Sequence, residues 1–525
     1  MRLRTGHWPR LLTGMGMRPP LYLSLLTLIL YLFWRGYDYA ISDQDEVLPY
    51  LMHLLDPSLY QFDWFVNVQL ESFGPRTLFV FMAWLPAKLF GPYATILIFY
   101  VVSWFGTSMA LYTLGLQLTR ERLAATICVV VTLLLTPKFT LGGNDLVTWI
   151  LTPSIPAWTL SLWGLVFFVR GRPMRAAILM GLATWMQALV GLQIAMVCAL
   201  LLLWRHGWTA LRPYLFTGNF TLAALPALGP LIWFQLTRPH PDGPWSYFYM
   251  LFEFRAPHHY MPTSFTPESA LGFAVLLGLG LASFSRVPRV YRTLIRRSLI
   301  IVAGLCALSF LCSEVLRVDT ITKLQLFKLT VLVKVFCVIM VSNVVAQLIQ
   351  RFSQRTVTVF FDHGHYAFGA TLLIAATLLI VSPDTLGIRQ APITDPAEQV
   401  ATWARQSTDK DAVFAVPPHW AHFRSQAQRA IVVNFKAIPF HQPYMTQWFT
   451  RLLDMAPITP PQRGGLNLIS SLDSAYLALP SEEIRRLSTT YGFQYIVRHE
   501  ADPPEDFQSV YQAGPWTVWR GDPQP

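Results

Sequence analysis

Residues 20–46 read PLYLSLLTLILYLFWRGYDYAISDQDE and decide the fold. The first part, up to Trp34, is almost wholly apolar, and we expect it to form the first membrane-spanning helix, although it is shorter than the ~20 residues that cross a bilayer comfortably. Basic residues precede it, but no small-residue cleavage site follows it, so we expect this helix to be retained rather than removed as a signal peptide. Three acids, Asp43, Asp45 and Glu46, follow the helix almost at once. The stretch therefore predicts a membrane protein with an acidic first loop.

The composition extends this prediction to most of the chain. Hydrophobic residues make up 53% of the 525 residues and charged residues only 13%, about half the usual share in soluble proteins. We expect about eleven crossings in residues 1–383 and a soluble domain in residues 384–525. Apolar runs lie near 20–36, 77–91, 93–117, 123–137, 155–169, 176–189, 190–204, 215–237, 269–285, 298–313, 327–349 and 364–383. Residues 176–204 are predicted to form either a tight hairpin of two short helices or one crossing with a re-entrant piece.

The distribution of charge predicts the orientation. The chain carries a net charge of +11, and residues 384–525 carry −2, so residues 1–383 carry +13. Most of this excess lies in short loops, which is a topology signal rather than a nucleic-acid footprint. Arg2, Arg4, Arg10 and Arg18 precede the first helix with no acid among them, which places the N-terminus in the cytoplasm. The other basic loops then also lie inside if the stretch 77–117 crosses only once, so we expect 77–91 to be a re-entrant or interfacial helix. Loops 37–76 and 238–268 and the C-terminal domain then lie outside the cytoplasmic (inner) membrane, in the periplasm.

Residues after 384 alternate helical and strand patterns, which predicts a small α/β domain. Helices are expected at 396–406, 422–429, 445–455 and 481–491, and strands at 412–416, 430–435 and 494–498, with a final hairpin around Gly514. No internal repeat is present.

The acidic loop 37–76 contains the first candidate site. Asp43, Asp45 and Glu46 repel one another, and such a cluster raises a carboxyl pKa or recruits a cation. The three acids are therefore candidates for a general base and for the ligands of a divalent cation such as Mg²⁺ or Mn²⁺. A solvated acidic loop that caps a helix is the alternative.

Two further segments contain basic residues that we expect on the same side of the membrane as the acidic loop. Arg255, His258 and His259 lie in the loop 238–268, and a guanidinium suits phosphate oxygens. Lys328 lies near the outer end of an apolar run, where a charge usually faces a cavity or a counter-ion. The alternatives are interfacial aromatic and His side chains at the headgroup level and a snorkelling lysine.

The long acidic loop directly after the first helix, the multi-helix core and the C-terminal α/β domain resemble the GT-C superfamily of membrane glycosyltransferases. This resemblance implies a polytopic GT-C-like core and a sugar donor on a polyprenyl-phosphate carrier. It implies an acceptor on the outer side: a glycan, a lipid or a protein of the cell envelope. It places Asp43, Asp45 and Glu46 at the position of the catalytic acid, with Asp45 or Asp43 as the base and Asp63 as a partner that supports these acids. It also assigns the donor phosphate to Arg255, His258, His259 and Lys328.

Two other functions fit the same sequence. A transporter or flippase for a lipid-linked saccharide is one, although no duplicated half with matching broken helices is visible. A non-catalytic envelope assembly protein that works through its C-terminal domain is the other. No P-loop, G-x-G-x-x-G, G-x-S-x-G or H-E-x-x-H pattern occurs, which argues against ATP- or nicotinamide-driven chemistry.

Overall fold

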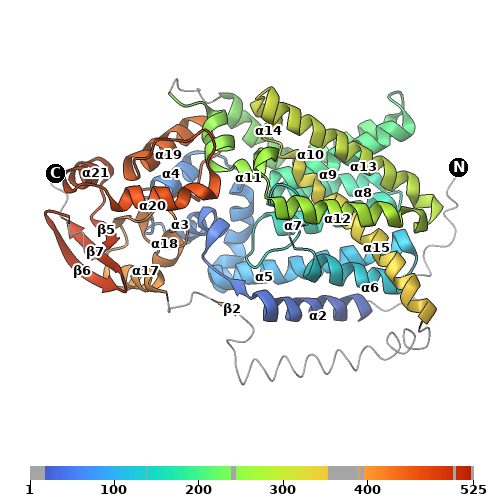
Figure 1. Ribbon diagram of the computed structural model, residues 1–525, viewed down its shortest axis with the longest axis horizontal. Helices are drawn as coiled ribbons and strands as arrows, with labels where there is room; N and C mark the ends of the chain where they lie inside the picture. The colour runs from blue at the N-terminus through green and yellow to red at the C-terminus, as the bar shows by residue number, and fades with distance from the viewer. Residues whose placement is uncertain are drawn as a thin grey trace, which may run out of the picture.

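The computed structural model describes residues 18–137, 139–237, 244–352, 388–389, 395–499 and 504–521. The chain forms a helical bundle with a mixed helix-and-sheet region at one end of it (Figure 1). The predicted apolar segment 364–383 and the predicted domain boundary at 383/384 lie outside the described residues, as do Arg2, Arg4 and Arg10.

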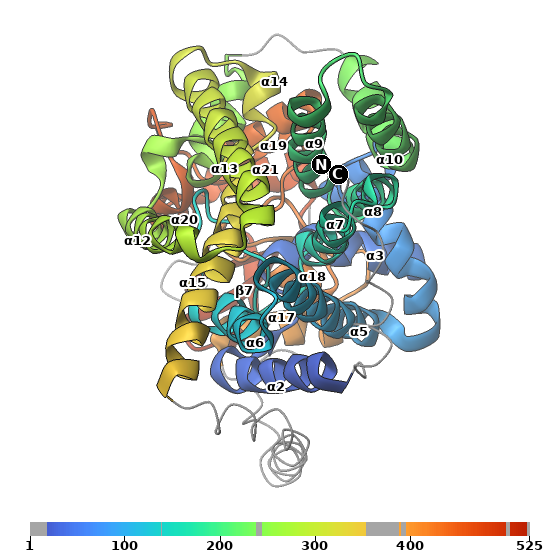
Figure 2. The same cartoon turned by 90° about the vertical axis from the view of Figure 1, so that its right-hand side faces the viewer.

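The bundle is that of a multi-pass membrane protein. Six helices of the described chain are long and apolar enough to cross a membrane, and three shorter apolar helices accompany them. Viewed along its length, the bundle has α2 on one side and α13 and α14 on the opposite side (Figure 2). Its helices are α2 (Arg18–Arg35), α5 (Thr77–Thr119), α6 (Arg122–Val130), α7 (Ser154–Val169), α8 (Pro173–Met186), α9 (Ala188–His206), α10 (Leu211–Thr237), α12 (Pro267–Ser283), α13 (Arg289–Phe310) and α15 (Thr330–Phe352).

Two breaks in these helices are explained by the residues that lie at them. Helices α8 and α9 meet at Gln187, whose side chain accepts a hydrogen bond from the Val190 amide and caps α9, so residues 176–204 form the hairpin of two short helices. Helix α5 is two helices joined across Gly91, which has φ 80° and ψ 161°, directly before Pro92. The part before Gly91 exposes Phe81, Leu85 and Leu89 at a spacing of four, which forms an apolar stripe along one face of this helix.

Short irregular elements fill the end of the bundle next to the C-terminal domain. Several are π or 3₁₀ turns, which are common near functional sites. They are β1 (Tyr37–Asp38), η1 (Ser42–Glu46), α3 (Leu48–Leu55), α4 (Trp64–Glu71), η2 (Val131–Leu135), η3 (Tyr249–Arg255), α11 (Pro257–Tyr260), η4 (Pro262–Ser264), η6 (Leu311–Val315), α14 (Asp319–Thr322) and η7 (Leu326–Leu329). One further 3₁₀ turn, η5 (Phe284–Arg286), joins α12 to α13 at the opposite end of the bundle, where Asn343 of α15 donates to the Arg286 carbonyl.

The C-terminal region is built on a five-stranded sheet of order β4-β3-β5-β7-β6. Strand β3 pairs in parallel with β4 and β5, whereas β7 is antiparallel to β5 and β6. The strands are β3 (Val413–Ala415), β4 (Ala430–Ile431), β5 (Tyr495–His499), β6 (Phe507–Ala513) and β7 (Trp516–Gly521). The helices are α17 (Pro396–Ser407), α18 (Phe423–Ala427), α19 (Gln442–Met455), η9 (Gly465–Leu468), α20 (Ile469–Leu477) and α21 (Ser481–Tyr491). The predicted helices and strands are all present, β4 is shorter than expected, and α20 was not predicted.

The two parts of the molecule share packing surfaces. Strand β1, at the start of the first loop, pairs in parallel with β2 (Ile388–Arg389). One apolar core contains residues of η3, such as Phe252 and Phe254, together with Trp448 and Phe449 of α19. Phe254 and Phe449 lie with ring centroids 4.9 Å apart. The C-terminal domain is therefore packed directly onto the loops that hold the predicted site residues.

Candidate active site

The three acids of the first loop lie in the 3₁₀ helix η1 and point in different directions. With three residues per turn, Asp43 and Glu46 share one face, and Asp45 lies on another. Asp43 forms an ion pair with Lys436, Glu46 with Arg76, and Asp45 with Arg424. The carboxylates thus bind three separate cations.

Asp45 and Asp63 belong to a buried network with the C-terminal domain. Asp45 accepts hydrogen bonds from Arg424 Nη1 (2.8 Å), Asn434 Nδ2 (2.8 Å) and Ser425 Oγ (2.9 Å). Asp63 accepts from Arg424 Nε at 2.8 Å and from the amides of Ile431 and Val66 at 3.0 Å. All five side chains are buried. We call Asp45, Asp63, Arg424, Ser425 and Asn434 the Asp45 network; it fastens the first loop to the C-terminal domain.

Asp43 faces a different environment, rich in cations. Its carboxylate is 35% exposed, and its ion-pair partner Lys436 comes from the loop after β4. Arg255 donates from Nη2 to the Lys436 carbonyl at 2.9 Å and lies over the Phe435 ring at 4.7 Å. Arg76, Lys328 and the two histidines lie within electrostatic reach of Asp43. We call this set the Asp43 centre: Asp43, Arg76, Arg255, His258, His259, Lys328 and Lys436.

The structure therefore brings together Asp43, Arg255, His258, His259 and Lys328 from three separate segments of the chain. It directs Asp45 and Asp63 away from them, into the Asp45 network. Glu46 stays beside the Asp43 centre through its pairing with Arg76.

The histidines contribute no charge to this centre at neutral pH. Burial, together with the neighbouring His259, lowers the pKa of His258 to about 2. Burial lowers the pKa of His259 to about 4, although its Nδ1 lies 2.7 Å from the Gly142 carbonyl. Gly143 packs so closely that a Cβ there would lie 3.1 Å from the His259 ring, and its φ is +66°. Both rings are thus held as neutral hydrogen-bonding groups.

Asp43 remains ionised. Burial alone would raise its pKa, but the positive charges of Lys436 and Arg76 outweigh burial and hold the pKa below its usual range. Burial lowers the pKa of Lys436, and the charge of Asp43 opposes this shift. The ion pair therefore stabilises the charged form of both groups.

The Asp43 centre has more hydrogen-bonding capacity than the described residues use. Arg255 Nε and His258 Nδ1 are buried and have no hydrogen-bond partner there. The side-chain ammonium group of Lys328 is buried and makes no hydrogen bond or ion pair with the residues that the structure describes. Four basic side chains, those of Arg76, Arg255, Lys328 and Lys436, meet only two carboxylates. Buried polar groups are normally satisfied, so this excess indicates an anionic ligand.

The backbone before Lys328 is fixed by a buried amide. Gln325 has a left-handed conformation with φ 48°, and the Gln193 side chain donates to the carbonyls of Leu324 (2.5 Å) and Gln325 (3.1 Å). This turn begins η7 and directs Lys328 to the Asp43 centre. Lys334, one turn and a half further on, instead pairs with Asp145 at 2.7 Å inside the bundle, which accounts for its burial.

The predicted metal ligands do not converge. No group of three or more His, Cys, Asp or Glu side chains among the described residues is arranged to hold a metal ion. Because Asp43, Asp45 and Glu46 each pair with a different basic side chain, they do not fit the Mg²⁺ or Mn²⁺ site expected from their sequence spacing.

One functional candidate, Arg76, escaped the sequence analysis. It is the first basic residue after the acids of the first loop and pairs back to Glu46. Lys436 and Arg424 lie in a polar and aromatic stretch of the C-terminal domain, for which the sequence favours ordinary surface over a roof of the membrane cavity or a contact with the acceptor. A basic residue close behind an acidic loop is the signal that could have identified Arg76.

Comparison with solved structures identifies the fold. The crystal structure of ArnT from Cupriavidus metallidurans bound to undecaprenyl phosphate matches with a TM-score of 0.52 and 11% sequence identity. The match covers 96% of this chain and 98% of that one. The chain has the fold of ArnT. This likeness confirms the predicted fold class: a helical membrane core with a C-terminal region that contains a small sheet.

Other comparisons add less. The structure of ArnT from the same organism in the apo state matches with a TM-score of 0.42 at 10% identity, over 96% of this chain and 97% of that one. Residues 395–455 match a family described as a domain of unknown function (DUF6798). No curated protein matches the sequence. The DUF6798 segment contains Arg424, Ser425, Asn434 and Lys436, so it supplies residues to both the Asp45 network and the Asp43 centre.

Proposed function

We propose that this chain is a membrane glycosyltransferase that takes a sugar from a polyprenyl-phosphate donor. The observation that supports this proposal most is the composition of the Asp43 centre. Its basic groups outnumber its carboxylates, and Arg255 Nε and His258 Nδ1 have no hydrogen-bond partner among the described residues. The ArnT-like fold supports the proposal, because that relative was crystallised with undecaprenyl phosphate. A phosphate group would satisfy the unpaired donors and balance the charge.

In this reaction an acceptor oxygen or nitrogen attacks the anomeric carbon of the sugar. The bond between that carbon and the phosphate oxygen breaks, and its electron pair leaves on the polyprenyl phosphate. Arg255, Lys328 and Lys436 stabilise the negative charge that develops on the leaving phosphate. A carboxylate accepts the proton that the acceptor loses.

Asp43 is the carboxylate best suited to accept this proton. It lies at the Asp43 centre and is partly exposed, whereas the Asp45 carboxylate already accepts hydrogen bonds from three side chains. The donor phosphate competes with Asp43 for Lys436, and transfer of Lys436 to the phosphate frees Asp43 to act as the base. Glu46 positions Arg76 through their ion pair.

The proposal includes an orientation. The N-terminus lies in the cytoplasm, the protein spans the cytoplasmic membrane, and the C-terminal domain lies in the periplasm. This follows from the basic loops at one end of the apolar segments and the acidic loop at the other. The acceptor is then a glycan, lipid or protein of the cell envelope.

Binding of undecaprenyl phosphate to the purified full-length protein tests the proposal. We expect the lipid to raise the unfolding temperature of the wild type. Arg255→Met should weaken binding at least about tenfold, because a hydrogen bond to a charged group contributes about 1.5–3 kcal/mol. Arg485→Met, which removes an exposed arginine of α21, is the matched control and should bind normally. Equal binding by the wild type and Arg255→Met would contradict the assignment of the phosphate site.

A further inference from the structure

A turn with two glycines packs against one histidine of the Asp43 centre. Gly142 and Gly143 have positive φ angles of 72° and 66°, a conformation that glycine adopts without strain. A Cβ on Gly143 would lie 3.1 Å from Cε1 and 3.2 Å from Nδ1 of His259. The edge of the His259 ring that contains Nδ1 therefore lies directly against this turn.

The turn is fastened to helix α15 on both of its sides. Lys334 Nζ donates to the Thr136 carbonyl before the turn and forms an ion pair with Asp145 after it, at 2.7 Å. The Leu141 amide donates to Thr330 Oγ1, at the start of α15, at 3.0 Å. These bonds hold the turn, and with it the ring of His259, in a fixed position relative to α15.

The turn also determines which nitrogen of His259 carries the proton. Nδ1 lies 2.7 Å from the Gly142 carbonyl, and a carbonyl oxygen can only accept a hydrogen bond, so Nδ1 is the donor. Burial lowers the pKa of His259 to about 4, and the ring is therefore neutral at neutral pH. Because the single proton of the neutral ring is on Nδ1, Nε2 has a lone pair and no proton.

His259 Nε2 is available to a ligand. It makes no hydrogen bond with the residues that the structure describes, and it remains accessible rather than buried. Asp43, Lys328 and Lys436 lie within electrostatic reach of the ring, so a ligand at the Asp43 centre lies close to it. The oxygens of an ionised phosphate are acceptors only and cannot donate to a lone pair, whereas a hydroxyl group can.

We propose that His259 Nε2 accepts a hydrogen bond from a hydroxyl group of the bound substrate. This inference rests on the proposed function and deepens it, because Arg255 then recognises the phosphate and His259 recognises a hydroxyl. The sugar of the donor is bonded directly to the phosphate, whose binding groups Lys328 and Lys436 lie near His259. A hydroxyl group of the transferred sugar is therefore favoured over one of the acceptor.

Two substitutions of His259 separate its bond to the turn from its bond to the ligand. The amide of Asn places an N–H near the position of Nδ1, so His259→Asn retains a donor to the Gly142 carbonyl but has no atom at the position of Nε2. Gln is longer, and in His259→Gln the amide oxygen can accept a hydrogen bond near the position of Nε2.

Binding to the purified full-length protein is measured for undecaprenyl phosphate and for the same lipid carrying glucose, galactose, mannose or arabinose. His259→Asn should weaken binding of at least one sugar-linked lipid about two- to tenfold, which is the contribution of one hydrogen bond. It should leave binding of undecaprenyl phosphate and the unfolding temperature unchanged. His259→Gln should restore most of the lost affinity.

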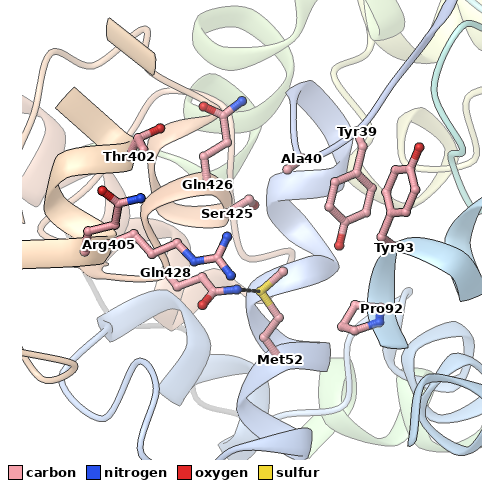
Figure 3. A pocket seen from close by; sticks show the side chains of 11 residues that line it. Tyr39, Ala40, Met52, Pro92, Tyr93, Thr402, Arg405, Ser425, Gln426 and Gln428 are labelled. Carbon is pink, nitrogen blue, oxygen red and sulfur yellow. Dashed lines mark hydrogen bonds between the residues drawn. The ribbon is translucent and has the colours of Figure 1, made fainter. Parts of the chain in front are cut away.

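Two control variants should bind all of these lipids like the wild type. His53 Nδ1 lies 2.7 Å from the Leu59 carbonyl, outside the Asp43 centre, so His53→Asn is the matched change at another histidine of the first loop. Arg405→Gln removes a positive charge from the wall of a hollow of about 500 Å³ that no residue of the Asp43 centre lines (Figure 3).

The outcomes distinguish this inference from the proposed function. If the wild type does not bind undecaprenyl phosphate, the proposed function fails, and this inference fails with it. If undecaprenyl phosphate binds but His259→Asn changes neither the affinity for any sugar-linked lipid nor the KM of the acceptor, only this inference is overturned. Equal weakening of undecaprenyl phosphate and the sugar-linked lipids also overturns it. A rise in the acceptor KM alone supports the hydroxyl contact and assigns that hydroxyl to the acceptor.

Discussion

Asp43 and Asp45 stand two residues apart on one turn of helix, yet their surroundings differ in kind. Asp45 shares Arg424 with Asp63 and is hydrogen-bonded by Ser425 and Asn434, all of them buried. Asp43 is partly exposed and lies among basic groups, of which Arg255 has a side-chain nitrogen without a hydrogen-bond partner among the described residues. A satisfied buried network stabilises one geometry, whereas an unsatisfied, charged centre is prepared to bind a ligand. The comparison favours a structural role for Asp45 and a role in ligand binding and catalysis for Asp43.

The largest expected effect separates these two acids in an activity assay. Asp43→Asn should lower the transfer rate by about 10²–10⁴-fold, the usual contribution of a general base, because the amide cannot accept the proton. Its unfolding temperature should stay close to that of the wild type. Asp45→Asn should instead lower the yield of folded protein, with transfer per folded molecule changed by less than about fivefold. Transfer lost in a fully stable Asp45→Asn, and retained in Asp43→Asn, would reverse the assignment.

The next effect is on stability. Arg424→Met leaves two buried carboxylates without their shared counter-ion, and breaking a buried pair costs about 3–5 kcal/mol. We expect a correspondingly lower unfolding temperature. Lys436→Met removes the counter-ion of the partly exposed Asp43 and should change stability far less. Equal losses in the two variants would show that the Asp43 centre is as structural as the Asp45 network.

A smaller effect concerns the pH dependence of transfer. Asp43 must be ionised to act as the base, so transfer is lost as the pH falls through its pKa. Lys436 and Arg76 hold that pKa below its usual range. In Lys436→Met the pKa rises, and the acid limb of the pH–rate profile should move to higher pH, measured as kcat/KM in the variant and the wild type. Arg485→Met provides the control, and an unmoved acid limb in Lys436→Met would exclude Asp43 as the titrating group.

The sequence predicted the architecture well, because hydrophobic length and basic loops follow from the membrane itself. It also predicted that Asp43, Arg255 and Lys328 would lie near one another, because all three were placed on the same side of the membrane, where opposite charges next to an apolar bundle attract each other. It did not predict which acid belongs to which centre. That depends on the 3₁₀ turn of η1, which places Asp45 on a different face from Asp43 and Glu46. It also depends on Arg424 and Lys436, which reach the loop from far along the chain through tertiary packing alone.

The smallest expected effect lies at the edge of the same domain contact. Lys410 binds Asp56 at 2.8 Å, but the two side chains are 57% and 42% exposed. Hydrogen bonds from Lys410 and Ser58 hold the Asp56 pKa at about 2. The stability gained from this depressed pKa is present above the ordinary pKa of about 4 and is lost as the pH falls toward 2. Water and salt screen an exposed pair, so Lys410→Met should lower the free energy of unfolding by less than about 1 kcal/mol at pH 7, and by less still in high salt. A loss as large as that of Arg424→Met, measured by chemical unfolding at both salt concentrations, would mean that the domain is held by its exposed rim rather than by the buried Asp45 network.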